Sequence, residues 1–544
     1  MIFSGIFLKR AAAAALLFFS LACEAQSARH FMVAAAHPLA VDAGAAVLKG
    51  GGTAVDAAVA VQMVLGLVEP ESSGIGGGAF LLHWSQSEKR LRSYDGRETA
   101  PAAARPDRFL GSDGSPMAFL DAAVGGRSVG VPGVLRMLEA AHRRHGKLAW
   151  RSLFAHAIAA AEQGFALSPR LHAQLERERF LREDPAAREL FYGKDGKPKA
   201  AGARIVNPEY AATLRVVAER GADAFYRGEI ARDIVRAVRS HARPGDLAEE
   251  DLAAYRALER PPLCGPYRAW RVCSMGPPSS GGIAVLQILG LLERVAFARA
   301  ARHSEAAVHL FTEAGRLAYA DRARYAGDPD FVQVPVARLL DGKYLDERAR
   351  LIGERSMRQA LPGDFEAGTS HLSIVDAAGD AVAMTTTIES SFGSRILVRG
   401  FLLNNQLTDF DFKPGSANEV APRKRPRSSM APTIVFEGGE RVRLVLGSPG
   451  GPNIINYVAR TLVATLDWGF DVQSAIALPN FGSRNGPTLL ESGTDYEALR
   501  AGLESRDHVV QSAPLPSGLH AIERVPDGWR GGADPRREGV ARGE

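Results

Sequence analysis

Residues 368–389, GTSHLSIVDAAGDAVAMTTTIE, contain hydroxyl side chains at positions where two strands of a hairpin would present them together. Two segments alternate with a period of two, and the DAAGD stretch between them supplies a turn. A three-residue loop at 377–379 sets a register in which Thr369 lies opposite Thr387. Alternation adds Glu389 to the same face, although a two-residue slip or a bulge would change this pairing.

Thr369 has the residue type of a nucleophile but needs a base. No Asp–His pair stands at a readable spacing, and an ordinary lysine is only about one-thousandth free base at pH 7.5. An α-amine is roughly a quarter to a third free base at that pH. Cleavage of the Gly368–Thr369 bond would place such an amine on Thr369 itself, and Gly368 has no side chain to hinder the attack. Taken alone, a Gly-Thr pair also fits an ordinary strand start.

The segments around this hairpin indicate a mixed α and β architecture. Residues 54–67 are nearly all apolar, which predicts a buried helix. Residues from about 130 to 330 read as mainly helical, and short strands and turns follow from 369 onward. Gly74, Gly76 and Ala79 match a loose nucleotide-binding pattern, but a helix precedes it and a strand follows it. We therefore expect these glycines to allow close backbone packing, and we expect no organic cofactor.

Composition limits the possible partners. The chain has 544 residues, of which 46% are hydrophobic and 23% charged, so it can bury a large core. The formal charge of +5 is small for this length and no long basic run occurs, which argues against a nucleic-acid partner. His142 and His145 share a predicted helix face without a third ligand nearby. We interpret them as a solvated basic surface and expect no metal site.

The N-terminus has the pattern of a signal peptide over residues 1–25. Two positive charges precede a short apolar stretch, and small residues near Ala25 offer a cleavage point. The sequence thus predicts export, most simply to a bacterial periplasm. Cys23 leaves open a lipid anchor, although Ser20 stands where the lipoprotein pattern has leucine. No other segment is long and apolar enough for a membrane span.

The two remaining cysteines lie nine residues apart in PPLCGPYRAWRVCSMGPP. If Arg268 and Ala269 form a two-residue turn, Cys264 and Cys273 face each other across a hairpin. An oxidising compartment would allow a disulfide between them, and two small buried thiols fit equally well.

The order of motifs resembles the γ-glutamyltranspeptidase family, the glutathione hydrolases of the N-terminal nucleophile superfamily. The motifs are HPLAVDAGAAVLKGGGTAVDAAVA, VEPESSGIGGG, DGRETAP, MGPPSSGG, EAGRLAYADR, GTSHLSIVD, FLLNNQLTDF, RPRSSMAPTIVF and GSPGG. The resemblance implies an α+β fold, a four-layer αββα sandwich built from two autoprocessed subunits. These would be a large subunit, 26–368, and a small one, 369–544, which together form a heterodimer.

The resemblance also implies site residues. Thr369 would be the nucleophile with its own amine as base, and Thr387 would hydrogen-bond it. Gly450 and Gly451 would form the oxyanion hole, where a backbone donor is worth roughly 10²–10³ in rate. The remaining residues would bind the donor. The α-carboxylate of the donor would be bound by Arg97, Ser428 and Ser429. Its α-amine would be surrounded by Glu389, Gln406 and Asp409.

The implied reaction is γ-glutamyl transfer from a small-molecule donor such as glutathione to water, an amino acid or a peptide. The segment between Asp409 and Ser428 is short and lacks a lid insertion found in some members, which implies an open donor site. Two alternatives remain: an acylase for glutaryl-type amides such as cephalosporin side chains, and an unprocessed homologue that only binds γ-glutamyl compounds. The sequence does not predict the physiological donor, the ratio of hydrolysis to transfer, or the oligomeric state.

Overall fold

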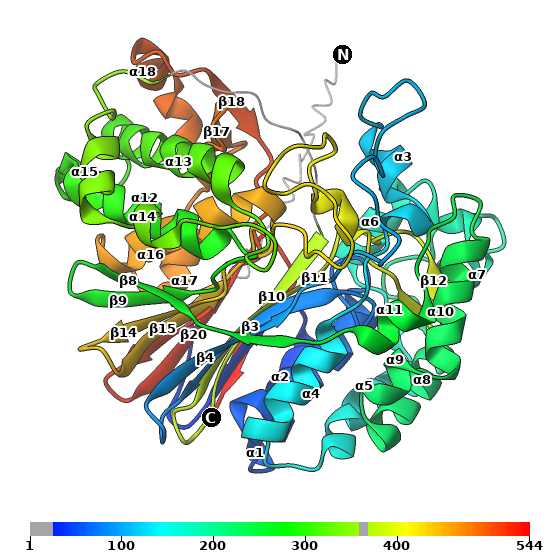
Figure 1. Cartoon of the computed structure of the whole chain (residues 1–544). Helices are drawn as coiled ribbons and strands as arrows, with labels where there is room; N and C mark the ends of the chain where they lie inside the picture. Colours follow the sequence, from blue (N-terminus) through cyan, green and yellow to red (C-terminus); the bar gives the residue numbers. More distant parts are fainter. Residues whose placement is uncertain (1–24, 358–367) are drawn as a thin grey trace, which may run out of the picture.

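The computed structural model describes residues 25–357 and 368–544 and has four layers. Two seven-stranded sheets stack face to face, and helices cover both outer faces (Figure 1). This arrangement confirms the predicted αββα sandwich. Cys23 and nearly all of the predicted signal peptide lie outside the described residues, so both predictions stay predictions.

The first sheet carries the hairpin at its centre, and its neighbouring strands are antiparallel. Four of its strands come from before residue 368 and three from 368 onward, so both predicted subunits build it. Its order is β21 (Val540–Gly543), β2 (Met32–Ala35), β10 (Gly368–Val375), β11 (Ala381–Glu389), β3 (Gly78–Ser85), β4 (Arg90–Gly96) and β7 (Leu258–Arg260).

The second sheet is also antiparallel and also draws on both parts of the chain. Its order is β1 (Gln26–Ala28), β20 (Gly528–Ala533), β19 (His520–Val525), β15 (Arg441–Gly447), β14 (Thr433–Glu437), β9 (Trp270–Ser274) and β8 (Leu263–Tyr267). Strands β8 and β9 pair Cys264 with Cys273 across the predicted two-residue turn, and the two sulfurs are bonded as a disulfide. The structure therefore supports a disulfide between these cysteines and not two buried free thiols.

Helices pack on the outer face of each sheet. Those on the first sheet include α1 (Pro38–Lys49), α2 (Ala54–Val68) and α4 (Val134–His145). Every residue of α2 is buried, as its apolar sequence predicts, and Thr53 begins it with a capping box. Those on the second sheet include α12 (Gly281–Arg294), α13 (Glu305–Tyr325), α16 (Ile454–Leu466) and α17 (Val472–Ala477).

The space between the sheets is filled by apolar side chains from both, among them Trp84, Phe436 and Ile522. The remaining helices are α3 (Phe119–Ala123), α5 (Ala155–Gln163), α6 (Pro169–Arg177), α7 (Pro185–Phe191), α8 (Pro208–Arg220), α9 (Asp223–Tyr226), α10 (Glu229–Ser240), α11 (Glu249–Ala254), α14 (Val336–Leu339), α15 (Gly342–Ala349) and α18 (Arg500–Ser505). The remaining strands are β5 (Phe165–Ala166), β6 (Arg204–Ile205), β12 (Leu397–Val398), β13 (Phe401–Leu402), β16 (Phe481–Gly482), β17 (Thr488–Glu491) and β18 (Val510–Ala513).

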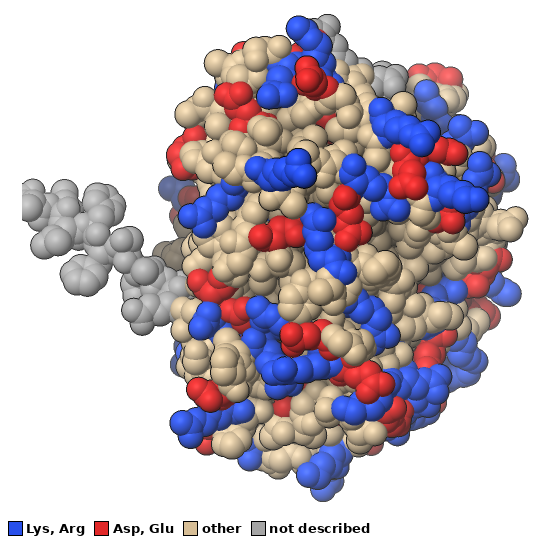
Figure 2. All heavy atoms as spheres, turned by 90° about the vertical axis from the view of Figure 1, so that its left-hand side faces the viewer, with Lys and Arg blue, Asp and Glu red and all other residues tan. Residues whose placement is uncertain are grey.

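Acidic and basic side chains are interspersed on the face shown in Figure 2, which is the left-hand side of Figure 1. No extended region of one charge sign covers this face among the described residues. Within residues 25–357 and 368–544, no helix combines the length and apolar character that a membrane crossing needs.

Candidate active site

The β10–β11 hairpin places two threonine hydroxyls next to each other. The register pairs Val375 with Ala381 and Thr369 with Thr387, as predicted. The Thr369 Oγ1 and Thr387 Oγ1 atoms are 3.4 Å apart, and both residues are buried. Thr387 Oγ1 also accepts the Glu389 N–H at 2.8 Å, so one of its lone pairs is occupied by a fixed donor.

A bulge ends this hairpin and turns Glu389 toward the pocket. Gly368 pairs with Glu389 while Thr369 pairs with Thr387, so Ile388 is the extra residue on β11. Glu389 has a φ of 81°, a left-handed backbone conformation that is rare for a residue with a side chain. The possible bulge noted from the sequence is therefore present, and Glu389 still faces the same pocket as the two threonines.

Glycines before β3 let other backbone pass close to the hairpin. A Cβ atom on Gly77 would lie 2.0 Å from the Thr387 carbonyl oxygen, and one on Gly76 would lie 2.2 Å from the Leu402 carbonyl oxygen. A side chain on Gly77 would push away the strand that carries Thr387, and one on Gly76 would push away β13. The expected packing role of this glycine-rich segment is confirmed at Gly76.

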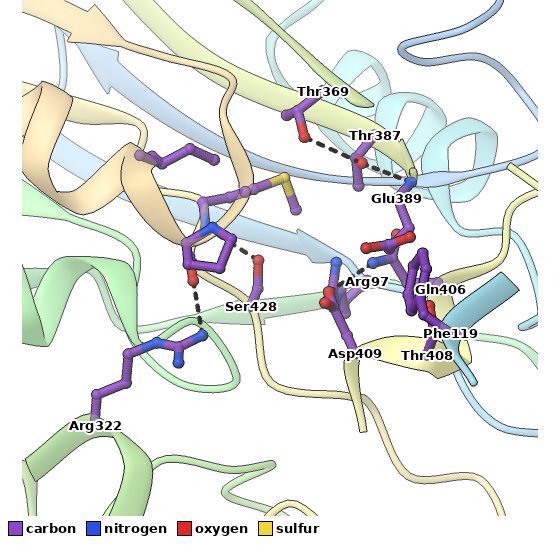
Figure 3. A pocket seen from close by; sticks show the side chains of 15 residues that line it. Arg97, Phe119, Arg322, Thr369, Thr387, Glu389, Gln406, Thr408, Asp409 and Ser428 are labelled. Atoms are coloured by element: carbon purple, nitrogen blue, oxygen red, sulfur yellow. Dashed lines mark hydrogen bonds and ion pairs between the residues drawn. The ribbon is translucent and has the colours of Figure 1, made fainter. Parts of the chain in front are cut away.

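A pocket of about 510 Å³, part of it open to solvent, contains Thr369 and brings together distant parts of the chain (Figure 3). Nine of the ten predicted site residues line it, and Gly450 directly precedes the lining residue Gly451. The lining residues are Arg97, Phe119, Arg322, Thr369, Thr387, Glu389, Gln406, Thr408, Asp409, Ser428, Ser429, Met430, Gly451, Pro452 and Ile454. Six lining residues are not among the predicted site residues: Phe119, Arg322, Thr408, Met430, Pro452 and Ile454.

Arg97 is buried at the end of β4 and is fixed by several acceptors. Its guanidinium forms an ion pair with Asp409 and donates to the Pro426 and Arg427 carbonyl oxygens at 3.1 and 2.9 Å. Asp409 also accepts from the Gln406 amide at 2.8 Å. Arg97, predicted to bind the α-carboxylate, and Asp409, predicted to bind the α-amine, therefore form an ion pair with each other.

Glu389 lies beside this pair in a buried position. One carboxylate oxygen accepts the Asn405 side-chain amide at 2.5 Å. Burial raises the pKa of the Glu389 carboxyl to about 8, and the negative charge of Asp409 contributes to the rise. The carboxyl is therefore mostly protonated at neutral pH when nothing else occupies the pocket.

Ser428 lies on the Arg322 side of the pocket, away from Glu389 (Figure 3), and Ser429 follows it in the chain. Arg322 is in the last turn of α13 and donates to Ser429 Oγ at 2.8 Å. The only sequence signal for Arg322 is its place at the end of the EAGRLAYADR motif.

Gly450 and Gly451 begin the turn before α16 with φ angles of 130° and 54°. In the described part of the chain, neither N–H group donates to another backbone group, so both are available. A Cβ on Gly450 would lie 2.5 Å from the Tyr457 ring. Both positions favour glycine for their positive φ angles, and Gly450 also needs it for space.

The prediction that His142 and His145 form a solvated surface is wrong. His142 Nε2 lies 3.3 Å from a buried carboxylate oxygen of Asp56, and His145 Nε2 lies 2.8 Å from the Tyr94 hydroxyl. The contact with Asp56 spans 86 positions of sequence, so no local pattern could reveal it.

A second group of potential metal ligands, His309, Glu313 and His508, is buried away from the pocket. Its members are already hydrogen-bonded. His309 Nδ1 and His508 Nε2 are 2.7 Å apart, and Glu313 accepts from Arg316 and from the Met357 N–H, each at 2.9 Å. Such a network satisfies its polar atoms without an ion.

Three comparisons place this site in a known family. The family model for gamma-glutamyltranspeptidase matches residues 40–544. The chain belongs to the γ-glutamyltranspeptidase family. It is 37% identical to the glutathione hydrolase proenzyme of Bacillus subtilis, over 94% of this chain and 91% of that one. Identity to the glutathione hydrolase proenzyme of Escherichia coli is also 37%, with the same two coverages.

The fold also matches a solved cephalosporin acylase from Bacillus halodurans, with a TM-score of 0.85 and 26% identity. The match covers all of this chain and 99% of the acylase. Family membership makes this γ-glutamyltranspeptidase-family protein an N-terminal nucleophile hydrolase, with hydrolysis and transfer of γ-glutamyl groups as its activity.

Proposed function

We propose that the chain cleaves itself between Gly368 and Thr369 and that Thr369 then carries the γ-glutamyl group of glutathione to water, an amino acid or a peptide. The observation that supports this most directly is the position of Thr369. It begins the central strand of the first sheet, it lines the pocket, and its hydroxyl is 3.4 Å from that of Thr387.

The reaction runs in two steps in this geometry. The Thr369 amine takes the hydroxyl proton as Thr369 Oγ1 attacks the γ-carbonyl carbon, and the amine proton then passes to the leaving nitrogen. Thr387 holds the nucleophile through its own hydroxyl. The N–H groups of Gly450 and Gly451 stabilise the oxyanion. Water or an acceptor amine attacks the resulting ester in the second step.

The α-carbon of a γ-glutamyl donor carries an ammonium group and a carboxylate group. These two charges complement Asp409 and Arg97. The donor's carboxylate takes the place of Asp409 as partner of Arg97, with Ser428 and Ser429 as further donors. Its ammonium group compensates Asp409 and Glu389, and Gln406 offers its side-chain oxygen, which has no hydrogen-bond partner among the described residues. A zwitterion therefore replaces the ion pair between Arg97 and Asp409 by two new charge pairs, one with each residue.

A denaturing gel tests the proposal, because it shows whether the chain has been cleaved into two fragments. The wild type should yield a smaller fragment whose N-terminal sequence is TSHLS, and it should release glutamate from glutathione. Thr369→Ala should stay a single chain and release none. Thr386→Val is the matched control, because Thr386 is a buried threonine of the same hairpin whose hydroxyl lacks a hydrogen-bond partner among the described residues.

Thr386→Val should process normally, because it removes a similar hydroxyl without touching the nucleophile. Cleavage and glutamate release by Thr369→Ala would rule out the proposed nucleophile. A wild type that persists as one chain after long incubation would favour the alternative of a γ-glutamyl-binding homologue.

Hydrolysis of glutaryl amides is a second candidate, favoured by the match to the cephalosporin acylase. A glutaryl group keeps a carboxylate for Arg97 but has no ammonium for Asp409. We therefore expect a higher kcat/KM for γ-glutamyl-p-nitroanilide than for glutaryl-p-nitroanilide. The reverse preference would favour the acylase.

Export to the periplasm is part of the proposal and is supported by the charged, apolar and small-residue order of residues 1–25. Mass spectrometry of the mature large subunit distinguishes cleavage after Ala25 from lipid attachment at Cys23. Recovery of the enzyme in the cytoplasm with residues 1–25 intact would contradict it.

A further inference from the structure

Arg322 differs from the other arginines around the pocket because its charge has no acidic partner. Arg97 pairs with Asp409, and Arg427 pairs with Asp411 at 3.0 Å. No carboxylate of the described residues lies within ion-pair distance of Arg322. Burial, together with the nearby charge of Arg427, lowers the pKa of Arg322 to about 10, so it remains a cation at neutral pH.

The hydrogen bonds of Arg322 fix the direction of two serine hydroxyls. A guanidinium only donates, so Ser280 Oγ and Ser429 Oγ each accept from Arg322, both at 2.8 Å. The Ser280 hydroxyl donates a hydrogen bond to the Ser428 carbonyl oxygen at 2.5 Å. The Ser429 hydrogen has no acceptor within residues 25–357 and 368–544, so it is available to a ligand in the pocket.

Ser428 is held in the same way by a different donor. Its hydroxyl oxygen accepts the Met430 N–H at 3.1 Å, and its hydrogen likewise finds no acceptor in the described part of the protein. In Figure 3, Ser428 lies between Arg322 and Arg97. This wall of the pocket therefore offers two hydroxyl hydrogens and one uncompensated positive charge. A carboxylate is the complementary group, because it carries a negative charge and only accepts.

We propose that Arg322 is a specificity-determining residue for the α-carboxylate of the donor: it supplies the uncompensated charge and orients Ser429 as a hydrogen-bond donor. This inference rests on the proposed function, since it places a γ-glutamyl donor in this pocket. Arg97 supplies a positive charge to the donor only after the donor has taken the place of Asp409, whereas Arg322 has no acidic partner to be displaced among the described residues.

The test compares two donors that differ only in the carboxylate, γ-glutamyl-p-nitroanilide and 4-aminobutyryl-p-nitroanilide. Arg322→Gln should lower kcat/KM for the γ-glutamyl donor about 10- to 100-fold, mainly through KM, as the loss of a charged hydrogen bond predicts. The value for 4-aminobutyryl-p-nitroanilide should change less than about threefold. Arg322→Lys keeps the charge but not the fork that reaches both serines, so it should give an intermediate selectivity.

Arg324→Gln is the matched control. It removes the same charge from the same helix, but Arg324 is exposed and outside the pocket, so both rates should stay at the wild-type level. Two-fragment processing of each variant on a gel checks that it folds. If Arg322→Gln does not accumulate, the intermediate selectivity of Arg322→Lys decides the question.

One result would overturn this inference alone: a ratio of the two kcat/KM values that stays at the wild-type level in both Arg322 variants. If both values fall by the same factor, Arg322 has a structural role. A wild type that processes itself but hydrolyses no γ-glutamyl donor would instead overturn the proposed function and this inference with it.

Discussion

The preference for γ-glutamyl over glutaryl donors should increase as the pH rises from 6.5 to 8.5. The change in pH acts through the carboxyl group of Glu389. This group faces Asp409, Arg97, Arg395 and the Asn405 amide. In the empty site its pKa is about 8, so most molecules carry it neutral below that pH. An ammonium group beside it favours the ionised form, so a γ-glutamyl donor must displace a proton below pH 8.

The pKa of Glu389 sets the size of the effect. A carboxyl with a pKa of about 8 is ionised in roughly 3% of molecules at pH 6.5 and in roughly 75% at pH 8.5. If only the ionised form binds the ammonium group, the affinity for the γ-glutamyl donor rises about 25-fold across this interval. A glutaryl donor has no ammonium and gains nothing. The ratio of the two kcat/KM values should therefore rise by about one order of magnitude or more.

The assay measures kcat/KM for γ-glutamyl- and glutaryl-p-nitroanilide on one enzyme preparation at half-unit pH steps. Both donors use the same nucleophile, so protonation of the Thr369 amine cancels in the ratio. Glu389→Gln is the control, because it is neutral at every pH and should give a flat ratio. A flat ratio in the wild type, or an equal slope in Glu389→Gln, would refute the assigned role of Glu389.

Two further substitutions test other parts of the structure. Gly450→Ala should lower kcat about 10²–10³-fold with little change in KM. The reason is that the new methyl group meets the Tyr457 ring and shifts an N–H group that stabilises the oxyanion. An unchanged kcat would contradict this role. Replacing Cys264 and Cys273 together by serine should lower the free energy of unfolding in denaturant by about 2–3 kcal/mol. It should leave kcat/KM unchanged, because neither residue lines the pocket, and an unchanged unfolding midpoint would argue against the disulfide.

Local pattern was enough to predict the hairpin but not its bulge. Period-two alternation and a three-residue loop favour a register in which Thr369 faces Thr387, and the structure has this register. The left-handed backbone of Glu389 has no sequence signature, because glycine or asparagine would be expected at such a position. The side chain of Glu389 is bonded to a residue outside the hairpin, the amide of Asn405.

Arg322 shows why sequence reasoning missed part of the pocket. A basic residue in the last turn of a helix is already explained by the helix dipole, so nothing marks it as a pocket residue. Arg97 was found only because its motif resembles a known one, since its partner Asp409 is 312 positions away. Charged pairs of this kind form when the layers assemble, and local periodicity does not predict them.

The placement of β10 explains how the chain can be cut at Thr369 without losing the site. Strand β2 pairs with β10 only from Leu372 to Val375, whereas β11 pairs along the whole strand. The first residues of β10 therefore extend past the part that pairs with β2, and Thr369 lines the pocket there. Of the β10–β11 pairs, only that of Gly368 with Glu389 lies on the N-terminal side of the proposed cut.

The new N-terminus stays anchored after such a cut. Its carbonyl oxygen accepts from Arg537 at 3.2 Å, and the next hydroxyl, on Ser370, donates to the buried Glu69 carboxylate at 2.7 Å. The pairing of Thr369 with Thr387 is also unaffected, because it lies on the C-terminal side of the bond. The fold thus holds the nucleophile by contacts that do not depend on the peptide bond whose cleavage would create it.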